Sequence, residues 1–148
     1  MRQKENGFTL IELMVTIAVL AIIAMMAAPS FSGVMAKQQL NSNTRELIST
    51  LSQARSQAVM LRNLVTVRIN PTTTCTPSPT VYCWYLTVNN SVTAPTAITS
   101  IVFGRDGAIS SGISADTDFV ICNAKTRTTR IFALTRMGAI YPKTDGTC

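Results

Sequence analysis

Residues able to carry out chemistry are few in this 148-residue chain, and their types argue against most enzyme classes. The sequence contains four cysteines but no histidine, which is the usual general base and the commonest metal ligand. No nucleotide-binding glycine string occurs, because Gly104 and Gly107 form a turn signal between two predicted strands. We therefore expect a protein that is not an enzyme and that carries no cofactor and no metal.

Cysteine is the residue type best suited to covalent chemistry here. The four cysteines form no C-x-x-C pair, and without histidine their spacing fits no zinc site. An even number in a chain with an export-type N-terminus indicates two disulfides in an oxidising compartment rather than free buried thiols. Of the three possible pairings, we expect Cys75–Cys83, which closes the shorter loop, and Cys122–Cys148, which would fasten the C-terminus to the domain.

Charged residues near the C-terminus offer two further kinds of site. Asp116 and Asp118 share a predicted loop and could hold calcium, although two carboxylates without other oxygen-rich neighbours favour a solvated loop. Beyond residue 123, five cations are accompanied by one carboxylate, Asp145. They could bind DNA phosphates, with Tyr141 stacking on a base, or form a solvated basic face. The five cations are Lys125, Arg127, Arg130, Arg136 and Lys143.

The N-terminal segment contains one carboxylate in unusual surroundings. Residues 1–7 are polar, and the stretch from Phe8 to Ala28 is apolar except for Glu12. Its length is close to the roughly 20 residues that span a bilayer, and the basic leader predicts a cytoplasmic N-terminus and an exported remainder. A carboxylate inside such a segment costs about 2.5–3.5 kcal/mol and therefore indicates a function. A secretory signal peptide cleaved after Ala28 would gain nothing from this carboxylate.

The string G-F-T-L-I-E from Gly7 to Glu12 resembles the class III signal of type IV prepilins and type II secretion pseudopilins. The resemblance implies that a prepilin peptidase cleaves after Gly7 and that Phe8 becomes an N-methylated N-terminus. It also implies that Glu12, the fifth residue after the cut, pairs with the N-terminal amine of a neighbouring subunit. Such an amine is the kind of partner that makes a buried carboxylate tolerable.

The helical pattern continues beyond the apolar stretch. Pro29 removes one helical hydrogen bond, so we expect a kink at this position within a longer helix, rather than its end. Apolar residues recur at helical spacing from Leu40 to Leu61, with polar residues on the other faces. This pattern predicts an amphipathic helix that packs on a sheet and stops near Asn63.

After the helix, the pattern changes to short alternating or β-branched runs. One helix followed by a run of strands predicts an α+β fold, with the helix packed on an antiparallel sheet. We expect a leader at 1–7, a membrane and filament-core helix at 8–35 and a globular domain at 36–148. Predicted strands are 65–69, 82–88, 99–103, 119–122, 130–135 and a short 139–141, and predicted loops are 71–81, 89–97 and 108–118.

Three longer strings, 51–69, 101–112 and 130–140, together with Trp84, are similar to FimT/FimU-type minor pilins and GspH pseudopilins. A terminal cysteine paired with Cys122 looks more like a minor pilin. FimT-type pilins of competent bacteria are linked to DNA uptake through a G-R-x-R motif near the C-terminus. The matching place here, 138–141, reads G-A-I-Y and lacks both arginines, so the resemblance does not imply DNA binding.

The resemblance therefore implies a minor pilin that helps to initiate a type IV pilus and supports twitching motility, adhesion or competence. Its partners would be other major and minor pilins, the prepilin peptidase and the inner-membrane assembly machinery. It would lie in the inner membrane before assembly, and afterwards in a pilus that crosses the periplasm to the cell surface. The alternatives are a DNA-binding pilin for natural transformation, a type II secretion pseudopilin, and a membrane-anchored periplasmic binding module that keeps residues 1–7.

Overall fold

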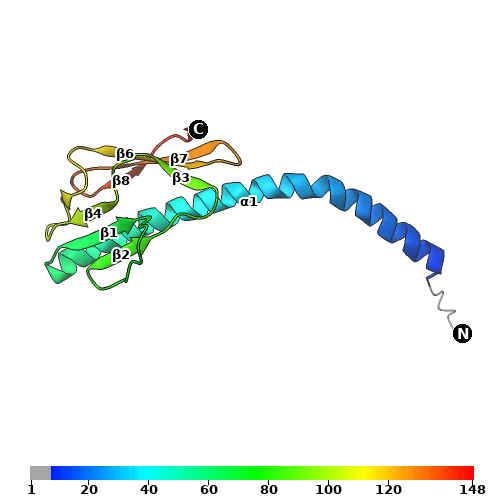
Figure 1. Cartoon of the computed structure of the whole chain (residues 1–148), viewed down its shortest axis with the longest axis horizontal. Helices are drawn as coiled ribbons and strands as arrows, with labels where there is room; N and C mark the ends of the chain where they lie inside the picture. Colours follow the sequence, from blue (N-terminus) through cyan, green and yellow to red (C-terminus); the bar gives the residue numbers. More distant parts are fainter. Residues whose placement is uncertain (1–7) are drawn as a thin grey trace, which may run out of the picture. The chain divides into compact units, whose positions relative to one another are not determined.

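The computed structural model of the chain describes residues 8–148, apart from the side chains of residues 26–30. The expected leader 1–7, with the cleavage position at Gly7, lies outside the described residues. The described chain contains one helix, α1 (Leu10–Leu61), and nine strands (Figure 1). The chain divides within α1 into two compact units, residues 1–35 and 36–148.

Helix α1 is continuous through position 29. Pro29 therefore does not end the helix, and the kink expected there stays a prediction. At the C-terminal end, Arg62 adopts a left-handed backbone with φ of 49°, and the amide of Asn63 donates to the carbonyl of Ala58 at 3.2 Å. This is the bond of a Schellman motif, which satisfies a carbonyl that the helix leaves open. It explains why α1 ends at Leu61.

The strands form two sheets within the 36–148 unit (Figure 1). The first has the order β2-β1-β4-β5 and consists of β1 (Val65–Ile69), β2 (Val81–Trp84), β4 (Ser100–Phe103) and β5 (Ile109–Ser111). The second has the order β3-β6-β7-β8, with β9 also paired to β7, and consists of β3 (Asn90–Ala94), β6 (Thr117–Asn123), β7 (Thr128–Leu134), β8 (Ile140–Pro142) and β9 (Gly146–Thr147).

The α+β class, with a long N-terminal helix and a largely antiparallel sheet, is confirmed. Strands β1 and β2 pair in parallel, whereas β1 with β4 and the pairs of the second sheet are antiparallel. The chain between β1 and β2 thus crosses back to the starting end of β1 instead of making a hairpin, which a parallel pair requires.

Two expectations about the strands are wrong. The segments 89–97 and 108–118 are not loops throughout, because they contain β3 and β5, which pair with β6 and β4. The strand expected at 82–88 ends at Trp84. Beyond that residue, Asn70 replaces the sheet partner: its amide donates to the carbonyl of Trp84 at 2.7 Å, and its Oδ1 accepts from the amide of Leu86 at 3.2 Å.

The hydrophobic core of the 36–148 unit lies between α1 and the two sheets. The helix contributes the apolar residues predicted at helical spacing, except that Leu61 at its end is 45% exposed. The rings of Phe119 and Phe132 stack with their centroids 5.2 Å apart. Buried members of the core include Leu40, Leu47, Leu51, Ala54 and Ala58 from α1, and Val65, Val67, Trp84, Ile101, Phe103, Phe119, Ile121, Phe132 and Leu134 from the strands.

Candidate functional site

The first turn of α1 contains the carboxylate that the sequence singled out. Thr9 precedes the helix, and its Oγ1 accepts a hydrogen bond from the amide of Glu12 at 3.3 Å. The carbonyl of Thr9 accepts from the amide of Leu13 at 3.2 Å. Thr9 is therefore the N-cap, and Glu12 lies where the open amides of the helix start favour a negative charge.

Sequence reasoning missed this local role of Glu12. Thr9-x-x-Glu12 is the pattern of a capping box, in which Glu at the third helical position supports the cap. Spacing alone reveals this pattern, because Thr9 and Glu12 lie three residues apart in the sequence. Glu12 therefore has a stabilising position within its own chain in addition to the intersubunit pairing that the resemblance implies.

The helix around Glu12 presents an apolar surface that no other described part of the chain covers. Every side chain described from Phe8 to Met25 is exposed. Among the described residues, no helical stretch meets the length and apolarity required to cross a membrane. Twelve large apolar side chains are at least half exposed: Phe8, Leu10, Ile11, Leu13, Met14, Val15, Ile17, Val19, Leu20, Ile22, Ile23 and Met25. A surface of this kind marks a region that an apolar environment or other helices cover.

Two disulfides are present, and they join the same cysteines that we expect from the sequence. Cys75–Cys83 links the segment before β2 to β2 itself, across a separation of 8 residues. Cys122–Cys148 links β6 to the C-terminal residue, across a separation of 26. The amide of Cys148 also donates to the carbonyl of Arg127 at 3.1 Å. The C-terminal segment is thus held covalently and by backbone bonds against the second sheet.

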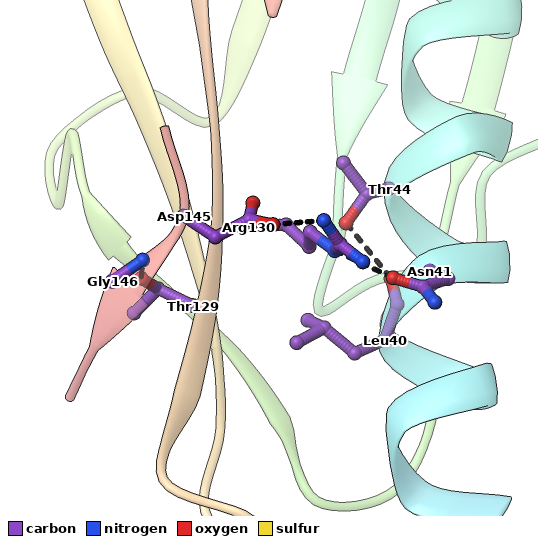
Figure 2. Close-up of polar contacts among 7 residues, drawn as sticks. All are labelled: Leu40, Asn41, Thr44, Thr129, Arg130, Asp145 and Gly146. Carbon is purple, nitrogen blue, oxygen red and sulfur yellow. Dashed lines mark hydrogen bonds and ion pairs between the residues drawn. The ribbon is translucent and has the colours of Figure 1, made fainter. Parts of the chain in front are cut away.

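Arg130 lies in β7 and bridges the C-terminal segment to α1. Its Nε donates to Oδ1 of Asn41 at 2.5 Å, and its Nη1 pairs with the carboxylate of Asp145 (Figure 2). The same guanidinium lines two adjoining hollows of about 380 and 290 Å³, both bordered by Asn41 and Asp145. This cation is therefore engaged in holding the domain together.

The other predicted cations do not gather into one patch. Lys143 Nζ pairs with Asp118 at 2.7 Å. Lys125 and Arg127 are exposed in the turn between β6 and β7. Arg136 lies in a different turn, whose Gly138 adjoins Gly107. The structure therefore divides the five candidate DNA-binding residues among separate places.

The two loop carboxylates considered for calcium each have a protein partner. Asp118 pairs with Lys143, and Oδ1 of Asp116 accepts from the backbone amide of Arg136 at 3.0 Å. Within residues 8–148, no group of three or more Asp, Glu, Cys or His residues is arranged to hold a metal ion. These carboxylates therefore bind the 116–118 segment to the turn after β7 and to the residue that follows β8.

Comparison with known proteins identifies the family to which these features belong. The motif described as the prokaryotic N-terminal methylation motif matches residues 2–28. The family described as Type II transport protein GspH matches residues 43–138, which is most of the chain. The chain belongs to the GspH family. This is a family of structural pilin and pseudopilin components, so the GspH-like chain is a component of a pilus or pseudopilus.

Two curated relatives are similar to parts of this GspH family member. Fimbrial protein EcpB from Eikenella corrodens is 47% identical over 53 residues, which cover 36% of this chain and 33% of the relative. Type II secretion system protein H from Aeromonas hydrophila is 31% identical over 68 residues, which cover 46% of this chain and 37% of the relative. The matched segments thus span about a third of each relative's length. No solved structure matches the chain.

Proposed function

We propose that this chain is a minor pilin of a type IV pilus, matured by cleavage after Gly7 and methylation of Phe8. The observation that carries the proposal is Glu12, in the capped first turn of a helix whose apolar side chains from Phe8 to Met25 are exposed. Packing such helices together removes their apolar surface from water or lipid, and a neighbour's N-terminal amine supplies the charge that Glu12 needs.

The proposal includes the membrane step before assembly. Helix residues 8–35 anchor the chain in the inner membrane with the N-terminus in the cytoplasm, and the assembly machinery then moves them into the filament. The 36–148 domain, with its two disulfides, contacts major and minor pilins and helps to start the filament. Twitching motility, adhesion or competence would depend on that filament.

Intact-mass spectrometry of the chain from its native membrane is the direct test. We expect the mass of residues 8–148 with two disulfides and one added methyl group. A chain that keeps residues 1–7 would contradict maturation and would favour a membrane-anchored binding module. A cleaved but unmethylated chain would support the peptidase step and contradict the modification of Phe8.

A type II secretion pseudopilin is the second candidate, supported by the GspH family match and the Aeromonas relative. The pilus role is supported instead by the Eikenella relative, which is a fimbrial protein, and by the disulfide that joins Cys148 to Cys122. Deletion of the gene separates the two. Loss of twitching with normal secretion supports the minor pilin, and the reverse supports the pseudopilin.

A DNA-binding pilin for natural transformation is the third candidate, and it stays a prediction. The ion pairs within residues 8–148 occupy Arg130 and Lys143, so Lys125 and Arg127 are the candidates best placed to reach a phosphate. A gel-shift titration with Lys125→Glu and Arg127→Glu variants tests this. Unchanged affinity in both variants would contradict DNA binding by these two cations.

A further inference from the structure

Arg68 of β1 is an isolated cation. It is the only charged residue from position 63 to 104, and Asp and Glu are absent from position 47 to 105. Its side chain is exposed, and its guanidinium takes part in none of the ion pairs or side-chain hydrogen bonds found within residues 8–148. No group of the described chain neutralises this charge, so it is available to a ligand.

The fold places Arg68 on the outer face of the first sheet. Alternate residues of β1 are buried in the core, and Arg68 lies between two of them, so its side chain is on the opposite face. Its register partners are Cys83 of β2 and Ser100 of β4, which continue the same face on either side. The guanidinium therefore stands on a surface built from three neighbouring strands.

A hollow of about 370 Å³ surrounds this position, and we call it the Arg68 hollow. Strand β1 contributes Thr66 and Arg68, the chain after β1 contributes residues 70–73, and Thr99 and Ser100 lie at the start of β4. The lining thus contains the hydroxyl groups of four threonines and one serine, and no carboxylate. Within residues 8–148, none of these hydroxyls has a hydrogen-bond partner.

The walls of the Arg68 hollow are fixed by bonds to the rest of the 36–148 unit. The amide of Ile69 donates to the carbonyl of Thr99 at 2.9 Å, which joins β1 to the start of β4. The amide of Asn70 donates to the carbonyl of Trp84 at 2.7 Å, and the disulfide Cys75–Cys83 fastens the following loop to β2. A ligand therefore meets a preformed surface and does not have to order the loop.

The chemistry of this lining selects a ligand with one negative charge and several hydroxyl groups. A guanidinium binds a carboxylate through two parallel hydrogen bonds. Threonine and serine hydroxyls both donate and accept hydrogen bonds, which matches the hydroxyl groups of a sugar. The ring of Pro71 and the threonine methyl groups add a small apolar surface for the C–H groups of a sugar ring.

Two other kinds of ligand fit the Arg68 hollow less well. Binding to DNA takes its free energy from neutralising several phosphates, and the segment from 63 to 104 supplies one cation. The lining also has no aromatic ring on which a base would stack. A docked protein segment needs large apolar or aromatic contacts at its centre, and the lining offers none.

We propose that the Arg68 hollow binds a sugar residue that carries a carboxylate, such as a uronic acid of an acidic polysaccharide. The guanidinium of Arg68 pairs with the carboxylate, and the hydroxyls of the 70–73 loop and of Thr99 bond to the sugar hydroxyls. The site lies entirely within the 36–148 unit. It is therefore independent of the proposed maturation and of whether the chain serves a pilus or a pseudopilus.

The test titrates the full chain with methyl glucuronide and methyl glucoside, which differ only in a carboxylate that replaces a hydroxymethyl group. The chain is kept in an uncharged detergent without a sugar headgroup, and isotope-labelled threonine methyl groups report binding by NMR. We expect the glucuronide to shift the signals of the lining threonines with a dissociation constant on the order of 1 mM. The glucoside should bind at least about tenfold more weakly, because it has no charge-assisted bond to Arg68. Equal affinity of the two probes, or no saturable shift with the glucuronide, would overturn the proposal.

Matched variants assign the binding to the Arg68 hollow. Arg68→Gln should give the two probes equal affinity, whereas Arg105→Gln removes an exposed arginine from the β4–β5 turn and should change nothing. Thr72→Val/Thr73→Val should weaken both probes several-fold. Thr74→Val/Thr76→Val changes exposed threonines of the same loop that do not line the hollow, and should leave both affinities intact. A preference for the glucuronide that survives Arg68→Gln, or equal effects of the two threonine pairs, would overturn the proposal.

Two competitors separate the sugar from other anions. Acetate supplies a carboxylate without a sugar, and a single-stranded oligonucleotide supplies phosphates and bases. We expect neither to displace the glucuronide when present at equal concentration. Displacement by acetate that Arg68→Gln abolishes would show a simple anion site, and the same result with the oligonucleotide would show a nucleic-acid site. Either result would overturn the proposal of a sugar ligand.

Discussion

Glu12 has a stabilising position within its own chain, and the proposed function gives it a second one between chains. Within the chain, it lies in the capped first turn, where the amide of Glu12 already bonds to Thr9 and a carboxylate is favoured by the helix start. Between chains, the resemblance implies a bond to a neighbour's N-terminal amine. The first role needs an oxygen acceptor, which Gln also provides in a capping box, whereas the second needs a charge.

Glu12→Gln distinguishes the two roles of this residue. We expect the variant to be cleaved and retained in the membrane normally, because capping is preserved. Incorporation into sheared filaments should fall more than about tenfold, because breaking a buried ion pair costs about 3–5 kcal/mol. Immunoblots of filament and membrane fractions measure both quantities. Glu46→Gln, an exposed carboxylate on the same helix, is the control. Normal incorporation of Glu12→Gln would show that capping is the whole role.

At the scale of elements, two turns beside α1, residues 104–107 and 135–138, approach each other closely through their backbones. Gly138 has a φ of 75°, and a Cβ at this position would lie 2.4 Å from the carbonyl oxygen of Gly107. That same oxygen accepts from Nε of Arg55 at 3.1 Å. The 104–107 and 135–138 turns thus meet over one arginine of the helix, and the contact leaves no room for a side chain.

Gly138→Ala should therefore destabilise the domain. We expect the free energy of unfolding to fall by about 1–3 kcal/mol from backbone strain, with more lost if the turn shifts away from Arg55. Urea unfolding of the full chain in detergent, followed by near-UV circular dichroism, measures it. Gly33→Ala is the matched control, since a Cβ there meets nothing within 4 Å and the residue lies inside α1. A Gly138→Ala midpoint equal to that of Gly33→Ala would refute the close-approach argument.

The two disulfides should differ in their effect on stability because they close loops of different length. Loop-closure entropy predicts a loss of about 3.5 kcal/mol when Cys122–Cys148 is removed, and about 2.5 kcal/mol when Cys75–Cys83 is removed. Removing each pair as a double Ser variant and comparing the urea midpoints tests the order. The reverse order would indicate that the loop before β2 contributes native contacts beyond its cross-link.

At the scale of the whole molecule, the chain consists of two compact units with different surfaces. The cluster of buried apolar residues begins at Leu40 and lies entirely within the 36–148 unit. The described side chains from Phe8 to Met25 are exposed. The stability of the second unit therefore does not depend on the apolar segment, which keeps its surface for assembly or lipid.

The fragment 36–148 should therefore fold alone when it is exported to an oxidising compartment. We expect one cooperative unfolding transition and no free thiol after denaturation. Leu51→Ala, at a fully buried helix position, should lower the free energy of unfolding by about 2–5 kcal/mol. Circular dichroism melts and a thiol assay measure these quantities. A broad transition with binding of a hydrophobic dye would show that the fragment needs the rest of the chain.

Short-range patterns in the sequence were enough to predict a large part of this protein. The apolar run with Glu12, the helical stripe up to Leu61 and the alternation at 65–69 are each produced by neighbours within a few residues, so spacing alone reveals them. The α+β class and the pilin-like family followed from those segments. The strand at 90–94 did not, because its composition is that of a loop and only pairing with β6 makes it a strand.

The tertiary structure decided which distant residues meet. From the sequence, Arg130 and Lys143 are candidate members of a basic patch. In the structure, they form ion pairs with Asp145 and Asp118. The parallel pairing of β1 with β2 and the bond between the 85–89 and 124–127 turns likewise join residues far apart in sequence. Such contacts are set by how the whole core packs, which no local period encodes. The sequence therefore determined the apolar helix with Glu12, because its signals are local. The tertiary structure determined which cations are held in ion pairs and which are not.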